Sequence, residues 1–427
     1  MMVFGRRGLL AAAVGGAAGV LFVPARRPAR VSRPVAAPPV NPADWTSVRA
    51  QFALPDDVAN LSAFYFASHP AGVRAAIERH RAGMDADPLG YVEANQSTQD
   101  DRVARAAAGY LRTDAGQIAF TDSTTMGLGL LYSGLRLAPG DEVLTTEHDH
   151  YATHESLRLR GLRDGVRVRR VRLYDASERA TPQEMVARLA AALRPATRLV
   201  AITWVHSSTG VRVPVRQIAD AVAAANASRP EAERILLSLD GVHGFGAEDA
   251  TPDALGVDFL VTGTHKWLFG PRGTGLVWGR PQAWSRFTPV IPSFIDTTGA
   301  APGPWSTPGG FHSFEHRWAL AEAFDLHRTI GPRRVADRTH TLATALKDGL
   351  ATIGSVRLRT PRAAVASAGL VCCEVEGYGP HEAAAKLRGA KVISSATPYD
   401  PSYLRFGPTI INSESDVDRA LAAVRAL

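Results

Sequence analysis

The chain has 427 residues, of which 45% are hydrophobic and 21% charged, a composition typical of a globular protein of two or three domains. The net charge of +7 comes almost entirely from residues 1–37, which hold six Arg and no acid, and the remainder carries 42 basic against 41 acidic side chains. This balance argues against a nucleic-acid partner, because phosphate binding needs a clustered excess of basic side chains.

Residues 1–37 resemble a twin-arginine export signal followed by a linker. Arg6 and Arg7 precede a Gly- and Ala-rich apolar stretch from Leu9 to Val23, and a Pro- and Arg-rich tract follows it. We expect export to the periplasm or the cell exterior, with a cytoplasmic protein as the alternative. No later apolar run reaches ~18 residues, so no membrane-spanning segment is expected in the body of the chain.

Between residues 115 and 280, short apolar runs alternate with helical patterns. This alternation predicts an α/β fold with a parallel sheet covered by helices on both faces. One helix, Pro182–Leu193, begins after Thr181 as a cap, with Pro182 at its first position. The predicted strands are Gln117–Thr121, Glu142–Thr146, Val166–Leu173, Leu199–Val205, Arg234–Leu239 and Phe259–Thr262.

A Gly- and Pro-rich stretch at 292–310 ends this pattern, and a smaller α+β unit follows. We predict a large domain at 100–310 and a small domain formed by 41–99 together with 311–427. The small domain holds helices at Phe314–Ile330 and Pro332–Ile353, a last helix capped by Ser413, and strands at Val356–Arg359, Gly369–Val375, Val392–Ala396 and Tyr403–Phe406. Neighbouring residues of a strand point to opposite faces, so Cys372 and Cys373 are expected in the core, without a disulfide.

Five polar clusters follow predicted strands of the large domain. Ligands of open α/β sheets lie beyond the carboxyl ends of the strands, so these clusters are expected to meet at one site. They are Thr121 to Gly127, Glu147 to Tyr151, Ser207 to Gly210, Asp240 to His243 and Thr264 to Lys266.

Lysine is scarce in this chain, and its first position is therefore informative. Of the 48 basic side chains only four are Lys, and none precedes Lys266. Arg provides charge and ion pairs as well as Lys does, but it stays protonated and cannot form an imine. Lys266 within a Gly- and Pro-rich segment therefore indicates a Schiff-base nucleophile, although a structural Lys at the end of a strand remains the alternative.

Pyridoxal 5'-phosphate is a cofactor whose requirements match these clusters. Lys266 can hold its aldehyde, and a buried carboxylate such as Asp240 can keep its ring nitrogen protonated. His243 can reach the ring's phenolic oxygen, and His148 can stack on the ring. Backbone N–H groups and hydroxyls at a helix N-terminus suit the phosphate, as Thr124 and Thr125 offer, and His265 can add a donor. Each residue also has a structural explanation, as a helix cap, a turn residue or a buried His.

The motifs Asp-x-x-His, Thr-His-Lys-Trp and Gly-Pro-x-Gly-x-Gly resemble those of the class V aminotransferase family of fold-type I pyridoxal-phosphate enzymes. The Trp after the Lys is similar to the isopenicillin-N-epimerase-like branch. The resemblance, which runs from about residue 60 to the C-terminus, implies a large parallel-sheet domain with a smaller α+β domain.

The resemblance also implies roles for single residues. It makes Lys266 the imine Lys, and it assigns cofactor contacts to Asp240, His243, His148 and Ser207. Ser306 to Gly309 resembles a loop in which a Thr, here Thr307, reaches the phosphate of a neighbouring subunit, and this implies a homodimer. Arg405 matches the late Arg that binds a substrate carboxylate, a bidentate task suited to guanidinium. Further candidates for substrate selection are Asn60, Tyr65, His150, Tyr151 and His312.

Two departures and several alternatives remain. Cysteine desulfurases of this family carry a reactive Cys shortly before the late Arg, where this chain has Ser394 to Tyr399, so persulfide chemistry is not expected. Some relatives have Ser at the position of Gly263.

The expected reaction is transamination or epimerisation at the α-carbon of an amino acid. The alternatives are a C–S or β-elimination lyase with the same cofactor and, more remotely, a metal-dependent hydrolase that uses the cluster His148 to His154.

Overall fold

The computed structural model describes residues 39–295 and 298–427, so the export signal expected at 1–37 lies outside the described residues. Among the described helices, none combines the length and the apolarity that crossing a membrane requires.

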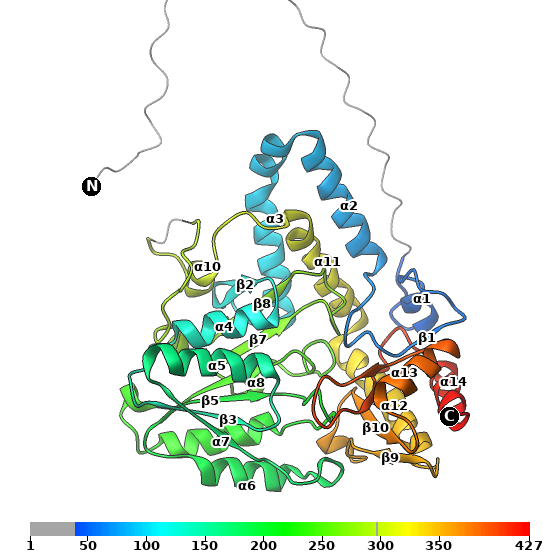
Figure 1. Cartoon of the computed structure of the whole chain (residues 1–427). Coiled ribbons are helices and arrows are strands. Elements are labelled where there is room, and N and C mark those ends of the chain that lie inside the picture. Colours follow the sequence, from blue (N-terminus) through cyan, green and yellow to red (C-terminus); the bar gives the residue numbers. More distant parts are fainter. Residues whose placement is uncertain (1–38, 296–297) are drawn as a thin grey trace, which may run out of the picture. The chain divides into compact units, whose positions relative to one another are not determined.

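Seven strands form the large sheet (Figure 1). Their order is β2 (Ile118–Thr121), β8 (Gly275–Gly279), β7 (Phe259–Gly263), β6 (Leu236–Asp240), β5 (Thr197–Thr203), β3 (Glu142–Thr146) and β4 (Arg167–Val171).

The large sheet is mixed, whereas the sequence predicted a parallel one. Strands β3 to β7 run parallel to their neighbours, but β8 is antiparallel to both β2 and β7. Strand β8 was not predicted, because glycines at both of its ends are typical of a loop. A Cβ on Gly275 would lie 2.8 Å from the Thr262 carbonyl oxygen, and one on Gly279 would lie 2.6 Å from the Trp284 ring. These glycines therefore allow close packing within the sheet.

Helices cover both faces of the large sheet, as the sequence predicted. Consecutive strand residues enter different cores: Leu260 belongs to one apolar cluster and Val261 to another, as the period of two requires. One face packs against α4 (Thr124–Gly134) and α5 (Tyr151–Asp164). The other packs against α3 (Pro88–Leu111), α6 (Pro182–Ala192), α7 (Val215–Asn226) and α11 (Phe314–Ile330). Helix α2 (Ala71–Ala86) lies beside α3 and α11 (Figure 1).

A second, antiparallel sheet holds the strands of the C-terminal part. Its order is β12 (Ser395–Ala396), β13 (Leu404–Phe406), β10 (Val371–Val375) and β9 (Val356–Leu358). Its core is shared with α12 (Pro332–Leu350), α13 (Pro380–Gly389) and α14 (Glu414–Arg425). Cys372 and Cys373 are buried and free, as expected.

The single strand predicted at 392–396 is divided in two. Strand β11 (Val392–Ile393) pairs in parallel with β1 (Ala59–Asn60), whereas β12 pairs with β13, and buried Ser394 separates the two. The chain changes sheet at this residue, and the apolar pattern carries no signal of that change. The division into domains at residues 100 and 310 stays a prediction.

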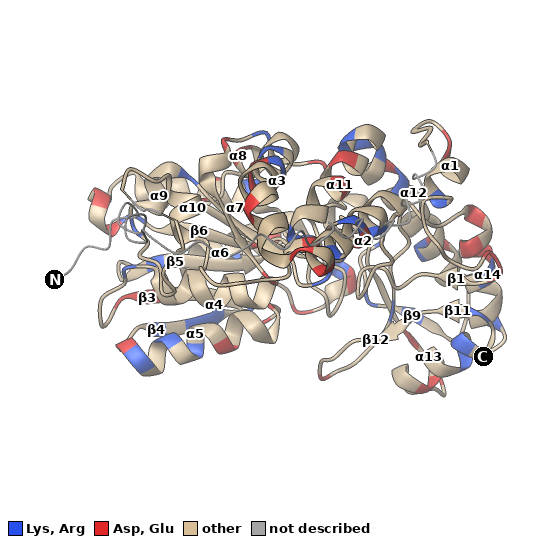
Figure 2. Cartoon of the chain, turned by 90° about the horizontal axis from the view of Figure 1, so that it is seen from above, with Lys and Arg blue, Asp and Glu red and all other residues tan. Residues whose placement is uncertain are grey.

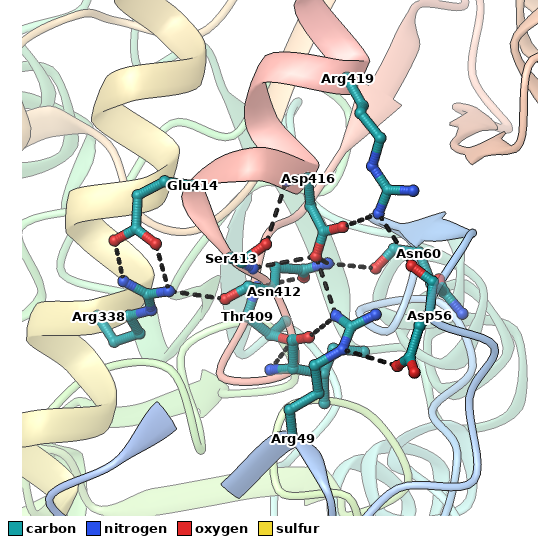
Figure 3. A network of polar contacts seen from close by, with 11 residues as sticks. Arg49, Asp56, Asn60, Arg338, Thr409, Asn412, Ser413, Glu414, Asp416 and Arg419 are labelled. Carbon is teal, nitrogen blue, oxygen red and sulfur yellow. Dashed lines mark hydrogen bonds and ion pairs between the residues drawn. The ribbon is translucent and has the colours of Figure 1, made fainter. Parts of the chain in front are cut away.

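A polar network fixes the start of the described chain against its last helix (Figure 3). Asp416 is 1% exposed, and its carboxylate accepts hydrogen bonds from Arg49 Nη1 at 3.0 Å and from the Ser413 amide at 3.0 Å. Arg49 ends α1 (Trp45–Arg49), and Ser413 caps α14 in a full capping box. The remaining helices are α8 (Pro252–Leu255), α9 (Pro281–Trp284) and α10 (Pro302–Ser306).

Candidate active site

A cavity of about 170 Å³ lies at the carboxyl ends of the strands of the large sheet. All five polar clusters that follow strands in the sequence contribute side chains to its wall, so the expectation that they meet at one site is confirmed. These side chains are Ser123, Thr124, Thr125, His150, Ser207, Asp240, His243, His265 and Lys266. Parts of the chain outside the large sheet complete the wall with Phe64, Tyr65, Pro398 and Arg405.

Asp240 and Lys266 share this cavity and perturb each other. Asp240 is the last residue of β6, is 1% exposed, and accepts a hydrogen bond of 3.1 Å from the Val242 amide. Burial raises the pKa of Asp240 and lowers the pKa of Lys266, while the charge of each favours the charged form of the other. An amine with a lowered pKa is more readily neutral, and only a neutral amine attacks an aldehyde.

The histidines of the cavity wall are neutral at physiological pH. Burial lowers the pKa of His150 and of His265 to about 4, and it lowers the pKa of His243 well below the ordinary value. The Nδ1 of His243 accepts a hydrogen bond of 3.2 Å from the Trp267 indole. Its Nε2 therefore carries the proton and is a donor for an oxygen atom of a bound ligand.

The N-terminus of α4 supplies donors for an anion. Ser123 caps this helix by accepting from the Met126 amide at 3.1 Å, and Thr124 and Thr125 form its first turn. Thr124 Oγ1 also accepts from the Gly263 amide at 2.7 Å. A Cβ on Gly263 would lie 3.0 Å from that oxygen, so a larger residue would crowd the turn. Free amides at a helix N-terminus and two hydroxyls form a suitable phosphate site.

Arg405 brings a positive charge to the wall of the cavity. It is 3% exposed, donates to the Ser207 carbonyl at 2.9 Å, and lies 4.7 Å from the centre of the Phe64 ring. No carboxylate of the described residues lies within ion-pair distance of it. Its buried charge is therefore free to bind an anionic ligand, which suits a substrate carboxylate.

His148, predicted to stack on the cofactor ring, does not line the cavity. Its imidazole stacks on Tyr174 instead, with ring centres 3.9 Å apart and planes 9° from parallel. His150, two residues later, lines the cavity, and its Nδ1 accepts from the Ala152 amide at 3.2 Å as the cap of α5. The turn after β3 directs His148 toward the end of β4, where its Nε2 accepts from the Leu173 amide, and its stacking on the cofactor stays a prediction.

Four other candidates also lie outside the cavity wall. The Thr307 hydroxyl accepts from the Phe120 amide at 3.1 Å and donates to the Gly303 carbonyl at 3.2 Å, within its own chain. Asn60 belongs to the network around Asp416, since its carbonyl accepts from Asn412 at 3.0 Å (Figure 3). Tyr151 is 64% exposed, and His312 packs on Phe314.

The cluster His148 to His154 does not converge on a common point. Asp149 accepts from Thr145 and from the Thr146 and Thr203 amides, and His154 bonds through Nε2 to the Thr146 carbonyl at 2.7 Å. Within 39–295 and 298–427, no group of three metal-ligating side chains is placed to hold an ion. The side chains of this cluster are thus used in separate structural bonds.

Tyr399 contacts two residues of the cavity wall, and the sequence did not single it out. Its hydroxyl is hydrogen-bonded to Ser207 Oγ, and its ring meets His150 edge-on at 6.2 Å. Burial raises the pKa of Tyr399 to about 12, so it is a protonated phenol. Its position in the sequence could have indicated it, because Tyr399 belongs to the segment in which desulfurases of this family carry a reactive Cys.

The family of the chain follows from its sequence over most of its length. The profile named Aminotransferase class-V matches residues 92–398. The chain belongs to this family. It is therefore a pyridoxal-phosphate-dependent enzyme that acts on an amino acid, as the sequence indicated.

Individual relatives are distant. Isopenicillin N epimerase of Streptomyces clavuligerus is 24% identical over 405 residues, which cover 90% of this chain and 98% of that protein. A cysteine desulfurase of Yersinia pestis is 26% identical over 378 residues, covering 83% and 86%. The solved structure of a mutant of C-DES, with glycine linked to its cofactor, superposes with a TM-score of 0.79 at 21% identity and covers 88% of this chain and 98% of that one.

The residues of the cavity suit the cofactor. Asp240 is a buried carboxylate without an ion-pair partner within 4.0 Å among the described residues, as a protonated ring nitrogen requires. The amides of the first turn of α4 suit a phosphate, and Lys266 suits an aldehyde. No wall residue of the cavity other than Asp240 is acidic, so a doubly charged phosphate would meet little repulsion.

Proposed function

We propose that Lys266 is the amine that holds the cofactor and that the enzyme exchanges a proton at the α-carbon of an amino acid. The observation that carries this proposal is the convergence of Lys266, Asp240 and Arg405 on one cavity. When bound, pyridoxal phosphate supplies an aldehyde that captures amines and a ring that withdraws electrons from the α-carbon. Asp240 would keep the ring nitrogen protonated. Burial raises the pKa of Asp240, and the positive charge of that nitrogen would favour the ionised carboxylate.

The other residues would position the reacting groups. Arg405 would bind the α-carboxylate of the substrate through its guanidinium fork. The N-terminus of α4 would bind the phosphate and His243 would donate to the phenolic oxygen. His150, which lines the cavity, would stack on the ring in place of His148. The amine of Lys266 would remove and return the proton at the α-carbon of the substrate.

Epimerisation or transamination is the favoured reaction type, supported by similarity to isopenicillin N epimerase over 90% of the chain. Elimination at a C–S bond is the second candidate, because structural neighbours include a cystine C–S lyase. A persulfide on the chain's own thiols is disfavoured, since burial raises the pKa of Cys372 to about 12 and leaves both thiols inaccessible. Two further proposals are a homodimer and export by the twin-arginine route.

The test is an absorption spectrum of the purified protein beside that of Lys266→Ala. We expect a visible band that borohydride removes from the wild type and that the variant lacks. The wild type, incubated with single amino acids in D₂O, then identifies the reaction by inversion at the α-carbon, by oxo-acid formation or by sulfide release. A protein that remains colourless after addition of pyridoxal phosphate would contradict the proposal.

A further inference from the structure

A second, larger cavity adjoins the candidate active site. Its volume is about 570 Å³, and it shares Tyr65 and Pro398 with the wall of the inner cavity. Helix α13, the link between β11 and β12, and β12 itself form the rest of this outer chamber. Helix α13 packs beside β12 (Figure 2). Its other lining residues are His381, Ala384, Ala385, Arg388, Ser394, Ser395 and Ala396.

Two serine hydroxyls of the outer chamber can donate a hydrogen bond to a ligand. Ser394 is 7% exposed, and its hydroxyl has no hydrogen-bond partner among the described residues. A buried hydroxyl without a partner costs free energy, which a bound acceptor would recover. Ser395 accepts from Arg405 Nε at 3.3 Å, which leaves its own O–H able to donate. Ser395 thus lies between the Arg of the inner cavity and the outer chamber.

The outer chamber is positively charged. Arg388 is exposed to it, and no carboxylate of the described residues lies within ion-pair distance of that guanidinium. None of the lining residues is acidic. The neighbouring Lys386 is not part of the lining, since its ammonium lies 5.3 Å from the centre of the Tyr378 ring. An anion in the chamber would meet one guanidinium and two hydroxyls without an opposing carboxylate.

We propose that the outer chamber binds the distal end of the substrate, an amino acid whose side chain leaves the inner cavity between Tyr65 and Pro398 and ends in a carboxylate. This inference rests on the proposed function, which places the α-carboxylate on Arg405. The small side chains of Ala384, Ala385 and Ala396 leave space for a long chain, and Arg388 binds its terminal carboxylate. Arg388 is thus the residue that determines specificity for acidic substrates.

The test compares amino acids that differ only at the distal end. L-2-aminoadipate, L-2-aminopimelate and L-2-aminosuberate are titrated into the cofactor-loaded wild type beside monocarboxylic amino acids of equal chain length. Kd is read from the change of the cofactor spectrum on mixing. We expect at least one diacid to bind about tenfold more tightly than its neutral counterpart, as a charge-assisted hydrogen bond implies.

Two variants assign that preference to the chamber. Arg388→Gln should abolish it, whereas Lys386→Gln removes the same charge from the same helix and should retain it. Equal binding of diacids and neutral counterparts by the wild type, or a preference that persists in Arg388→Gln, overturns the inference. L-Alanine separates the two proposals: if it perturbs the spectrum of wild type and Arg388→Gln alike, the proposed function stands whatever the diacids show. If no amino acid perturbs the spectrum, both proposals fail.

Discussion

Arg405 Nη1 donates a hydrogen bond of 2.9 Å to the main-chain carbonyl of Ser207. Arg405 belongs to β13 of the small sheet, and Ser207 follows β5 of the large sheet. This bond therefore joins the two sheets at the wall of the cavity. A guanidinium held by the main chain of the other sheet is preorganised, so a ligand need not order it.

Arg405→Lys should weaken amino-acid binding while the cofactor stays bound. Lys retains the charge but lacks the planar fork that matches a carboxylate. We expect KM to rise about 10- to 100-fold, from the loss of a charge-assisted hydrogen-bond pair. The cofactor spectrum without substrate is the control and should not change. A KM equal to that of the wild type would show that the α-carboxylate binds elsewhere.

Asp240→Asn should reduce kcat and leave the fold intact. The amide oxygen of Asn can still accept from the Val242 amide, but Asn carries no charge to keep the ring nitrogen protonated. We expect kcat to fall on the order of 100-fold or more, as for the loss of an electrostatic partner. Circular dichroism should be unchanged. Retention of full activity would remove Asp240 from the reaction.

His150→Ala and His148→Ala should have different effects, although only Asp149 separates the two residues. His150 lines the cavity, so its removal should shift the cofactor band and weaken cofactor binding. His148 stacks on Tyr174, so its removal should lower the free energy of unfolding by about 1 kcal/mol and leave the band unchanged. Spectra and urea unfolding of both variants test this assignment, and the reverse pattern would restore His148 as the stacking residue.

Lys347 should make the stability of the protein depend on alkaline pH. This Lys is 1% exposed and donates to the Pro361 and Arg362 carbonyls and to Ser367 Oγ. Burial lowers its pKa from 10.5 to about 8. Between these values the unfolded chain binds a proton that the folded chain has released, so the free energy of unfolding rises with pH.

Lys347→Met removes this titration and serves as the comparison. The wild type should gain up to about 3 kcal/mol relative to the variant as the pH rises from about 7 to about 10.5. The difference between the two proteins at about pH 7, where Lys347 is mostly protonated, includes the loss of its hydrogen bonds and serves as the baseline. Urea unfolding at a series of pH values measures the difference, and parallel curves for the two proteins would contradict the lowered pKa.

The local sequence was sufficient to predict most elements and to bring Lys266, Asp240 and the other polar clusters to one site. Helix Phe314–Ile330 and strand Glu142–Thr146 form with the predicted bounds. The apolar residues of the helix recur with the helical period on one buried face, and the strand is buried on both faces. The scarcity of Lys and the polar residues after successive strands placed Lys266 and Asp240 at one rim. That inference needs only the rule that parallel strands end at the same edge of a sheet.

The tertiary structure alone decided which of two neighbouring histidines faces the cavity and how the strands at residues 275–279 and 392–396 pair. His148 and His150 have the same chemistry, and only the bonds of the turn after β3 direct one onto Tyr174 and the other into the cavity. The outer chamber is likewise absent from any local pattern, since Tyr65, Arg388 and Ser394 meet only when α13 and the two short strands pack. Long-range packing sets these positions, because side-chain direction depends on contacts that sequence periodicity does not encode.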